Sequence, residues 1–545
     1  MDIKNFLLKN KFEILVFALI CIFMLANLSN MRLWNDEAET AVLGRNTLLF
    51  GVPKVLDGKN LITNNGNDYN PDFVWTWSSW LHIYIASLSF MIFGFSTFSA
   101  RIFFAAIGIL SFFPIISLFK KISLNRLHYY LSVLSLLFFV PYYIYSRQSR
   151  YFALLIFLMP LLMVSLYGIL FSKGKNLWFV WFIVSSVLLF HSNYLSFFVL
   201  MLPITIFLLW ILIKNQLMRK KLFKKLALSY FTIFLFTFPW ALYANIFNKA
   251  AGGSSLTNLI TRKVYYVLHD INYTVPILLI LFSAFFVLHK IRKFKQDDRQ
   301  KIFFYFYHAL IPLAILFFAS FSNIRYLIGL FPLLISIILI PVVFFIRSEK
   351  YTLKIAGALI LTLFLFTNIF YSAFFYAFVP IEDVLKAKCF ASVPKNLDCD
   401  AWVEDTFITP KELKFPFFYY LYEITHDYNG PVEGVVDYLN SHGKKNSVVF
   451  ANNEYFSIQF YTGMKVLNPY EYRNTDAVPD FIFVNFPNRR DIDSINYLVS
   501  YAESRGYAKV TLPYPDLPWD NREALWYHKY WTQPIKVPVT IYVKK

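Results

Sequence analysis

The chain has 545 residues, of which 57% are hydrophobic, 20% aromatic and only 16% charged. Its mean hydropathy of +0.49 excludes an ordinary soluble protein and is typical of proteins with many membrane-spanning helices. The formal net charge of +19 does not indicate a nucleic-acid partner, because the basic residues form short clusters between apolar runs. Three cysteines exclude a disulfide scaffold, and only Cys389 and Cys399 are close enough to suggest a bridge.

The first apolar run, 12–30, follows Lys4, Lys9 and Lys11 and has the general layout of a signal peptide. No small-x-small cleavage pattern ends the run. The sequence therefore predicts a retained first membrane helix, with its N-terminus on the inner side because basic residues prefer that side.

Eleven spans are predicted from apolar runs of about 20 residues, a length that crosses a bilayer core of about 30 Å. A twelfth run, 75–96, is predicted to lie along the membrane interface, because its tryptophans and tyrosine suit the headgroup zone. Every later basic cluster then falls inside, and the C-terminus lies outside. The predicted spans are 12–30, 100–119, 127–146, 151–172, 177–192, 194–213, 226–246, 274–290, 302–320, 327–346 and 355–377.

The composition changes after Val379, where acids begin to outnumber bases. The runs "NSVVFAN", "DFIFVNF", "KVTLPY" and "VTIYVKK" are β-like, while "GPVEGVVDYLNSHG" and "DIDSINYLVSYAESRG" have helical spacing and end at glycine. The fold class is therefore a polytopic α-helical membrane protein, with a membrane domain at 1–377 and a small external α/β domain at 378–545.

Acidic residues are scarce before residue 378, and half of them fall in the predicted first external loop, 31–99. They are Asp36, Glu37, Glu39, Asp57, Asp68 and Asp72. Asp36 and Glu37 come directly after the first helix, where a carboxylate can meet both a lipid headgroup and a water-borne acceptor. The plainer interpretation is that these two acids only solvate the loop. The last three acids stand among Gly, Asn and Pro residues that are typical of turns.

A set of short motifs follows the first helix in a fixed order. They are Asp36-Glu37, Arg45-Asn46, Gly51-Val52-Pro53, Phe93-Gly94 and Ala100-Arg101, followed later by "SRQSRYFALLIFLMP" and "NIRYLIGLFPLL". This set resembles the GT-C glycosyltransferases that use polyprenyl-phosphate sugars, of the protein O-mannosyltransferase and aminoarabinose-transferase type (glycosyltransferase family 39). The match covers most of the predicted membrane domain.

The resemblance implies inverting transfer of a hexosyl or pentosyl group from a polyprenyl-phosphate sugar to an acceptor at the external membrane face. Asp36 is then the general base, within reach of the attacking proton, and Glu37 orients the acceptor or the acid pair. The leaving phosphate needs cationic partners. The candidates are Arg325 with Tyr326, Arg147, Arg150, Lys263 and His269. For Arg325, which opens a span, simple snorkelling to the interface is the alternative.

The sequence is compatible both with a site that binds a metal and with one that does not. Some relatives share a divalent cation between the first-loop aspartate and an acid in the loop between spans three and four, and "YSRQSRYF" contains no acid. If Mg²⁺, Mn²⁺ or Zn²⁺ binds, Asp36 is the expected ligand. His82 and His191 stand alone on apolar segments and are expected to be packed rather than metal-bound.

Two further classes of function remain as alternatives, a transporter or lipid flippase and a non-catalytic assembly subunit. Acids that gather in an external loop, with spans almost free of them, favour the enzyme. The expected partners are a polyprenyl-phosphate sugar donor, an acceptor that is a lipid, a glycan or a protein, and the bilayer of a bacterial plasma membrane. No nucleotide-binding motif accompanies them.

Overall fold

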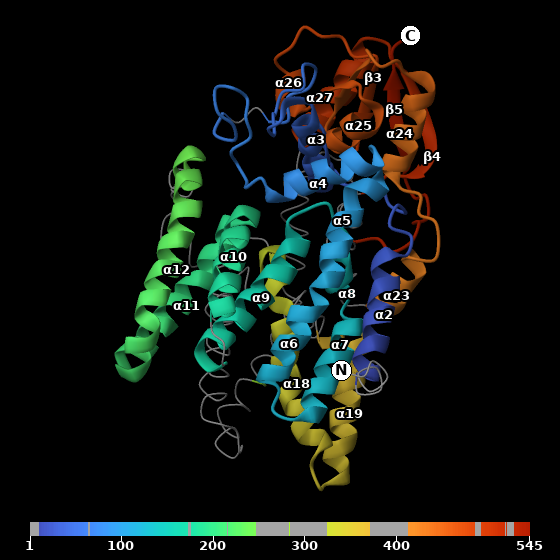
Figure 1. Ribbon diagram of the computed structural model, residues 1–545. Coiled ribbons are helices and arrows are strands. Elements are labelled where there is room, and N and C mark those ends of the chain that lie inside the picture. Colours follow the sequence, from blue (N-terminus) through green and yellow to red (C-terminus); the bar gives the residue numbers. More distant parts are fainter. Residues whose placement is uncertain are drawn as a thin grey trace, which may run out of the picture.

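The computed structural model describes residues 10–63, 66–172, 176–214, 216–246, 283, 324–370, 413–485, 492–517, 519, 521 and 528–545. Long helices form an elongated bundle, and a sheet built from the C-terminal part of the chain stands at one end of it (Figure 1). Helices α3 (Asn35–Phe50) and α4 (Leu81–Phe93), from the first loop, lie between the bundle and the sheet (Figure 1).

The bundle follows the predicted apolar runs closely. Its helices are α2 (Lys11–Leu25), α5 (Thr97–Leu110), α6 (Phe112–Ile122), α7 (Arg126–Phe138), α8 (Val140–Arg147), α9 (Phe152–Phe171), α10 (Asn176–Ser192), α11 (Tyr194–Lys214), α12 (Gln216–Tyr243), α18 (Phe331–Ile346) and α19 (Tyr351–Phe366). The predicted spans 274–290 and 302–320 lie outside the described residues, so the total of eleven stays a prediction.

Within the described ranges, five helices are long and apolar enough to cross a membrane, or six if α7 and α8 form one broken span. The five are Thr97–Ile122, Phe152–Phe171, Tyr194–Lys214, Leu222–Tyr243 and Ile328–Ile346. Helices of this length and composition define a membrane protein.

A proline explains the break of 52° between α7 and α8. Pro141 has no N–H to donate to the carbonyl of Leu137, four residues earlier, so the helical ladder is interrupted there. The hydroxyl of Tyr143 donates to the Leu137 oxygen instead, at 2.7 Å. The Leu137 carbonyl therefore keeps a hydrogen-bond partner at the bend, which sets the direction of the chain that leads to Arg147 and Arg150.

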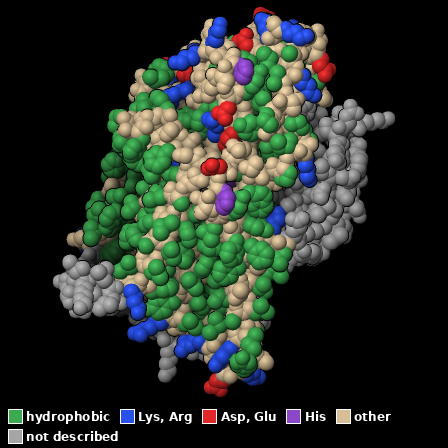
Figure 2. Space-filling model, turned by 90° about the vertical axis from the view of Figure 1, so that its right-hand side faces the viewer, with side chains coloured by type: hydrophobic (Ala, Val, Ile, Leu, Met, Phe, Trp, Pro, Cys, Tyr) green, Lys and Arg blue, Asp and Glu red, His purple; other side chains and the backbone are tan. Residues whose placement is uncertain are grey.

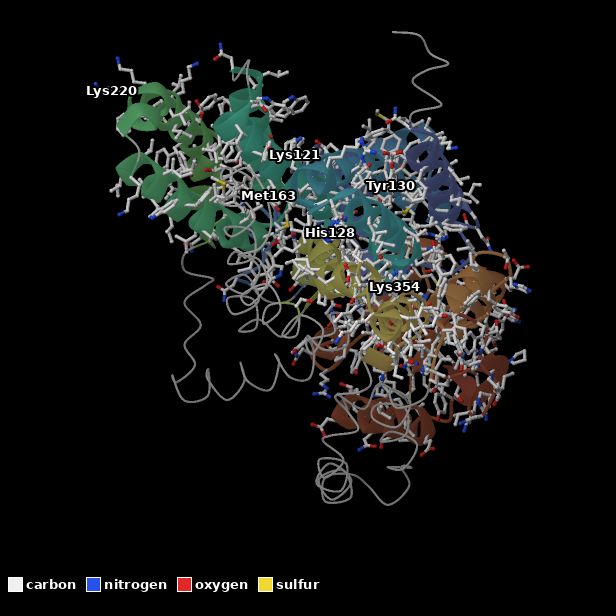
Figure 3. The ribbon with its side chains drawn as sticks, turned by 90° about the horizontal axis from the view of Figure 1, so that it is seen from below. Lys121, His128, Tyr130, Met163, Lys220 and Lys354 are labelled. Carbon is white, nitrogen blue, oxygen red and sulfur yellow. The ribbon has the colours of Figure 1, made fainter. Side chains whose placement is uncertain are left out.

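The surface of the bundle has the character that a bilayer requires. On one face, a broad hydrophobic band separates basic side chains at the lower end from mixed charges at the upper end (Figure 2). Lys121, Lys220 and Lys354, from three of the predicted inner clusters, lie at the end away from the sheet (Figure 3). Clusters that are far apart in sequence thus share one end of the bundle, as the charge pattern requires.

Helix α4 falls within the run predicted to lie along the interface, and it runs across the direction of the bundle helices (Figure 1). It ends at Gly94, whose φ of +72° suits glycine. Helix α3 packs tightly on it, because a Cβ at Gly44 would already lie 3.1 Å from that of Ala86. The platform formed by α3 and α4 holds the first-loop acids at the end of the bundle.

The C-terminal sheet has the strand order β2-β1-β3-β5-β4. The strands are β1 (Val448–Ala451), β2 (Lys465–Leu467), β3 (Phe481–Val484), β4 (Ala508–Pro515) and β5 (Pro538–Val543). Strands β1, β2 and β3 are parallel, while β5 is antiparallel to both β3 and β4. Four of the strands fall on the predicted β-like runs, and the three-residue strand β2 was not predicted.

Successive side chains of a strand point to opposite faces, so the sheet has two apolar layers. Val449 packs on one face with α24 (Pro431–His442) and α25 (Tyr455–Thr462). Phe450 packs on the other face with α26 (Pro469–Tyr472) and α27 (Ile492–Ser504). The layer of α24 and α25 faces the first loop.

Candidate active site

The first two acids of the loop lie in the first turn of α3, directly after its N-cap residue Trp34. A helix N-terminus carries a partial positive charge that stabilises nearby carboxylates. The two side chains nevertheless differ in surroundings, because Asp36 keeps a quarter of its surface exposed (25%) while Glu37 is fully buried (0%). Only Asp36 is accessible to a ligand.

Two predicted phosphate-binding arginines face Asp36. Nη1 of Arg325 lies 2.5 Å from Oδ2 of Asp36, and Nη2 of Arg150 lies 3.8 Å from the same oxygen. Both guanidinium groups are largely buried, where an ion pair is screened less than at the surface. The carboxylate and the two cations, which were predicted separately as base and phosphate ligands, therefore form one cluster.

Arg150 joins this cluster to the next turn of α3. Its Nη1 donates to the backbone oxygen of Asp36 at 2.9 Å, and to Glu39 Oε2 and Thr40 Oγ1 at 3.3 Å each. Burial raises the pKa of Glu39, and the charge of Arg150 opposes that rise. No local sequence pattern indicates that Glu39 and Thr40 share a partner with Asp36, because Arg150 lies far along the chain, in the segment between α8 and α9.

Arg325 reaches Asp36 from the short 3-10 helix η3 (Ile324–Leu330). Gly329 lets η3 approach α9, since a Cβ there would lie 2.3 Å from the sulfur of Met159 and 2.7 Å from the backbone oxygen of Leu155. The guanidinium of Arg325 also lies over the ring of Trp34, 5.9 Å from its centre. The close approach of η3 to α9 thus fixes the position of Arg325.

Glu37 and Arg101 form a second, deeper ion pair. Nε and Nη2 of Arg101 donate to the two oxygens of Glu37 at 2.9 and 2.7 Å. The backbone N–H of Ser149 also donates to Glu37, at 3.0 Å, while Nη1 of Arg101 donates to the carbonyls of Leu28 and Met31. Glu37 is therefore surrounded by protein groups and fastens the start of α3 to α5 and to the segment that carries Arg150.

Arg147, predicted to be a companion of Arg150, points to another part of the molecule. It donates to the backbone oxygens of Phe23 and Asn27 and to the hydroxyl of Tyr420, the last at 2.8 Å. Tyr420 belongs to α23 (Pro416–Glu423), whose apolar side chains join the core of the bundle. Arg147 thus connects α2, α8 and α23.

The other predicted site residues divide into two groups. Tyr326 lies in η3, but its side chain is outside the described residues, as are Lys263 and His269 entirely. Asp57 and Asp68 have the turn roles expected for them. Asp57 accepts hydrogen bonds from the backbone of Lys59 and Asn60, and Asp68 accepts one from Thr63.

The described residues contain no group of three or more His, Cys, Asp or Glu side chains that could hold a metal ion. His82 is buried, with its ring 5.5 Å from that of Tyr151, and His191 packs near Trp240. The groups facing Asp36 are guanidinium groups, which repel a cation. This donor set does not fit a divalent metal.

The C-terminal unit, which consists of the sheet and the helices packed on it, contacts the segment of chain that leads into α3. The backbone N–H of Arg32 donates to Oε1 of Glu433 at 2.9 Å, and that of Gly430 donates to Oε2 at 3.1 Å. Nη2 of Arg32 lies 2.5 Å from Oδ1 of Asp437, which belongs to α24, as does Glu433. Helix α24 therefore anchors the chain just before the acids.

The Glu433 contact predicts a pH dependence of stability. Burial raises the pKa of Glu433 to about 7, against the opposing effect of the backbone amides. A carboxyl group with a raised folded-state pKa binds more protons folded than unfolded, so stability falls as pH rises from about 4.3 to about 7. Between about pH 5 and about pH 8, we expect the melting temperature to fall less for Glu433→Gln than for wild type.

The exposed residue Asp476 supplies the control for this measurement. The Asp476→Asn variant is expected to keep the wild-type dependence of melting temperature on pH. Equal slopes for wild type and Glu433→Gln would contradict the raised pKa of Glu433.

Comparison with solved structures defines the fold. The structure of ArnT from Cupriavidus metallidurans bound to undecaprenyl phosphate matches with a TM-score of 0.52 at 10% sequence identity, over 97% of each chain. The apo state of that protein gives 0.51 at 12% identity over the same shares. The oligosaccharyltransferase AglB from Archaeoglobus fulgidus gives a TM-score of 0.48 at 13% identity, over 94% of this chain and 75% of the other.

No protein-family model matches the chain, and no curated protein does. The likeness to ArnT shows that the chain shares the fold of that protein. At these identities it defines the fold alone, so the reaction has to be argued from the site.

Proposed function

We propose that the protein is an inverting glycosyltransferase that moves a sugar from a polyprenyl-phosphate donor to an acceptor at the external membrane face. The observation that carries the proposal is the accessible carboxylate of Asp36, which faces Arg325 and Arg150 at one end of an apolar bundle. The fold of the chain is shared with ArnT, one structure of which holds undecaprenyl phosphate. That ligand is a lipid phosphate of the kind that the proposal requires.

In this reaction Asp36 acts as general base. Its carboxylate takes the proton of an acceptor hydroxyl or amine as the acceptor atom forms its bond to the anomeric carbon of the sugar. The bond from that carbon to the phosphate oxygen breaks, and the lipid phosphate leaves with the bonding electrons. Attack from the side opposite the phosphate inverts the anomeric centre.

Arg325 and Arg150 are the groups that we propose for the leaving phosphate. Arginine forks match phosphate oxygens, and they stabilise the charge that develops there. In the structure both face Asp36, so a phosphate can enter only by sharing these cations with the carboxylate. Tyr326, Lys263 and His269 stay predictions for the same headgroup. Arg147 has no part in the proposal, because its guanidinium is engaged at α2 and α23.

No step of the proposed reaction uses a metal, because the cations around Asp36 already supply the positive charge that the phosphate needs. We propose a bacterial plasma membrane, with the sheet on the outer side, since the basic clusters lie at the opposite end of the bundle (Figure 3). The sugar, hexosyl or pentosyl, and the acceptor, a lipid, a glycan or a protein, are not specified by these residues.

The test is sugar transfer by the purified protein in liposomes, with undecaprenyl-phosphate sugars labelled in a hexose or a pentose. Supporting results are label on a lipid, glycan or peptide acceptor together with free undecaprenyl phosphate, both unaffected by a chelator. Passage of the intact labelled lipid from one leaflet to the other, without cleavage, would support the transporter or flippase alternative instead.

The Arg325→Ala variant is expected to bind undecaprenyl phosphate about 10–100-fold more weakly than wild type, the range for losing a hydrogen bond to a charged group. Binding to protein in detergent is the measurement. Arg473→Ala is the matched control, because Arg473 donates to Ser494 Oγ and lies over the ring of Tyr497, both within the C-terminal unit. Unchanged affinity of Arg325→Ala would mean that Arg325 serves only as the ion-pair partner of Asp36.

A further inference from the structure

The C-terminal unit reaches the start of α3 through its helix α25. The two helices lie side by side (Figure 1), and the rings of Phe456 and Phe460 are buried in the apolar cluster of the first loop. That cluster includes Leu33, Ala38 and Ala41 from the loop side. A helix of the sheet unit is thus part of the same core as the acid-bearing helix.

Polar contacts from α25 concentrate on the residues just before Asp36. The hydroxyl of Ser457 donates to the backbone oxygen of Leu33 at 2.7 Å, and the N–H of Leu33 donates to the hydroxyl of Tyr461 at 2.9 Å. The backbone N–H of Phe456 donates to Oδ1 of Asn35 at 3.2 Å. These contacts hold the backbone of Leu33 and the side chain of Asn35, at the point where the chain enters α3.

The N-cap residue of α3, Trp34, provides no capping hydrogen bond from its side chain. A side-chain N-cap usually fixes the first turn of a helix, so the contacts with α25 supply support that α3 itself lacks. Glu454, which precedes α25, is held at a φ of +55°, in the left-handed region that non-glycine residues rarely adopt. At this contact, the backbone is therefore constrained both at the start of α3 and at the start of α25.

Tyr455, the first residue of α25, lies beside Asn35, the residue before Asp36. The side chain of Asn35 interacts with its hydroxyl, and the charges of Glu39 and Asp36 lie close enough to act on it. Burial, with a smaller contribution from these carboxylates, raises the pKa of Tyr455 to about 12. The hydroxyl therefore stays protonated at neutral pH, next to the side chain of Asn35.

We propose that α25 positions the general base, with Tyr455 and Asn35 as the positioning residues. The Asn35 amide, held by the Phe456 N–H on one side and the Tyr455 hydroxyl on the other, fixes the first turn of α3. That turn sets the direction in which Asp36 points toward the acceptor. This inference rests on the proposed function, and it gives the C-terminal unit a role in the chemical step rather than in sugar-donor binding.

The test compares Tyr455→Phe, Asn35→Ala and the double variant with wild type in the sugar-transfer assay. Each single variant is expected to lower kcat by about 10-fold with little change in KM for the sugar donor, because a small misplacement of a reacting group mainly slows the chemical step. The double variant is expected to lose about 10-fold rather than about 100-fold, since coupled residues act as one unit. Tyr470→Phe, changed at a largely exposed tyrosine of the same unit, is the matched control.

Hydrogen exchange of the peptide covering 33–40 supplies a readout that does not depend on activity. We expect about 10-fold faster exchange in Tyr455→Phe and Asn35→Ala than in wild type or Tyr470→Phe, because local opening becomes easier. An active wild type with unchanged kcat in Tyr455→Phe would overturn the positioning role and leave the proposed function intact. Absence of transfer by wild type would overturn the proposed function. In that case, unchanged exchange in Tyr455→Phe and Asn35→Ala would also show that α25 does not hold the first turn of α3.

Discussion

Replacing Asp36 by asparagine is expected to lower the rate of sugar transfer by about 10²–10⁴-fold, the range for removing a general base. The amide has nearly the same size as the carboxylate, but it cannot take the proton of the acceptor. Transfer from labelled undecaprenyl-phosphate sugars by purified protein in liposomes is the measurement. Asp72→Asn, changed at an exposed acid of the same loop, is expected to keep full activity.

Binding of the lipid phosphate separates the role of Asp36 as base from any role in binding. Asp36→Asn is expected to bind undecaprenyl phosphate at least as tightly as wild type, because the variant removes an anion that shares Arg325 and Arg150 with the phosphate. Undiminished transfer in Asp36→Asn would mean that Asp36 is only an ion-pair partner. Asp270, which lies outside the described residues, would then be the next acid to replace.

The sequence was sufficient to predict the members of the central cluster, but not their geometry. Arg150 and Arg325 lie 114 and 289 positions from Asp36 along the chain. They were identified because charged residues near predicted spans are few and each demands a partner or a function. The pairing of Arg325 with Asp36 depends on how η3 packs against α9, and that of Arg150 on the turn between α8 and α9; no local pattern encodes either.

Arg147 and Arg150 were both predicted as phosphate ligands, because arginine forks match phosphate oxygens and the two residues stand together in "SRQSRY". The sequence does not indicate in which direction each side chain points. Helix α8 ends at Arg147, and Gln148 has extended backbone angles, with ψ at 142°. The two guanidinium groups consequently diverge, one toward α23 and the other toward α3.

The strands of the C-terminal unit were predicted well where apolar and β-branched residues form runs of four or more, as in β1 and β5. The contact of Phe456 with Asn35, just before the acids, was not predicted. It joins positions 421 residues apart and depends on the packing of α25 against α3. The sequence of α25, YFSIQFYT, is largely aromatic and apolar and does not indicate which helix it packs against.

Breaking the buried pair between Glu37 and Arg101 is expected to have the largest effect on stability. In Arg101→Met the fully buried carboxylate of Glu37 loses its partner, and removal of one member of a buried pair costs about 3–5 kcal/mol. The loss should appear as a lower melting temperature in detergent. Lys120→Met is the matched control, because Lys120 pairs with Glu13 at 3.8 Å from a half-exposed position, where an ion pair contributes about 0–1 kcal/mol.

The double variant Glu37→Leu with Arg101→Met tests whether the unpaired charge causes the loss. It is expected to recover part of the stability lost in Arg101→Met, because no buried carboxylate then lacks a partner. Recovery should be incomplete, since Arg101 also binds the carbonyls of Leu28 and Met31, and Ser149 loses its acceptor. If Arg101→Met were as stable as wild type, the ion pair between Glu37 and Arg101 could not be what fastens α3 to α5.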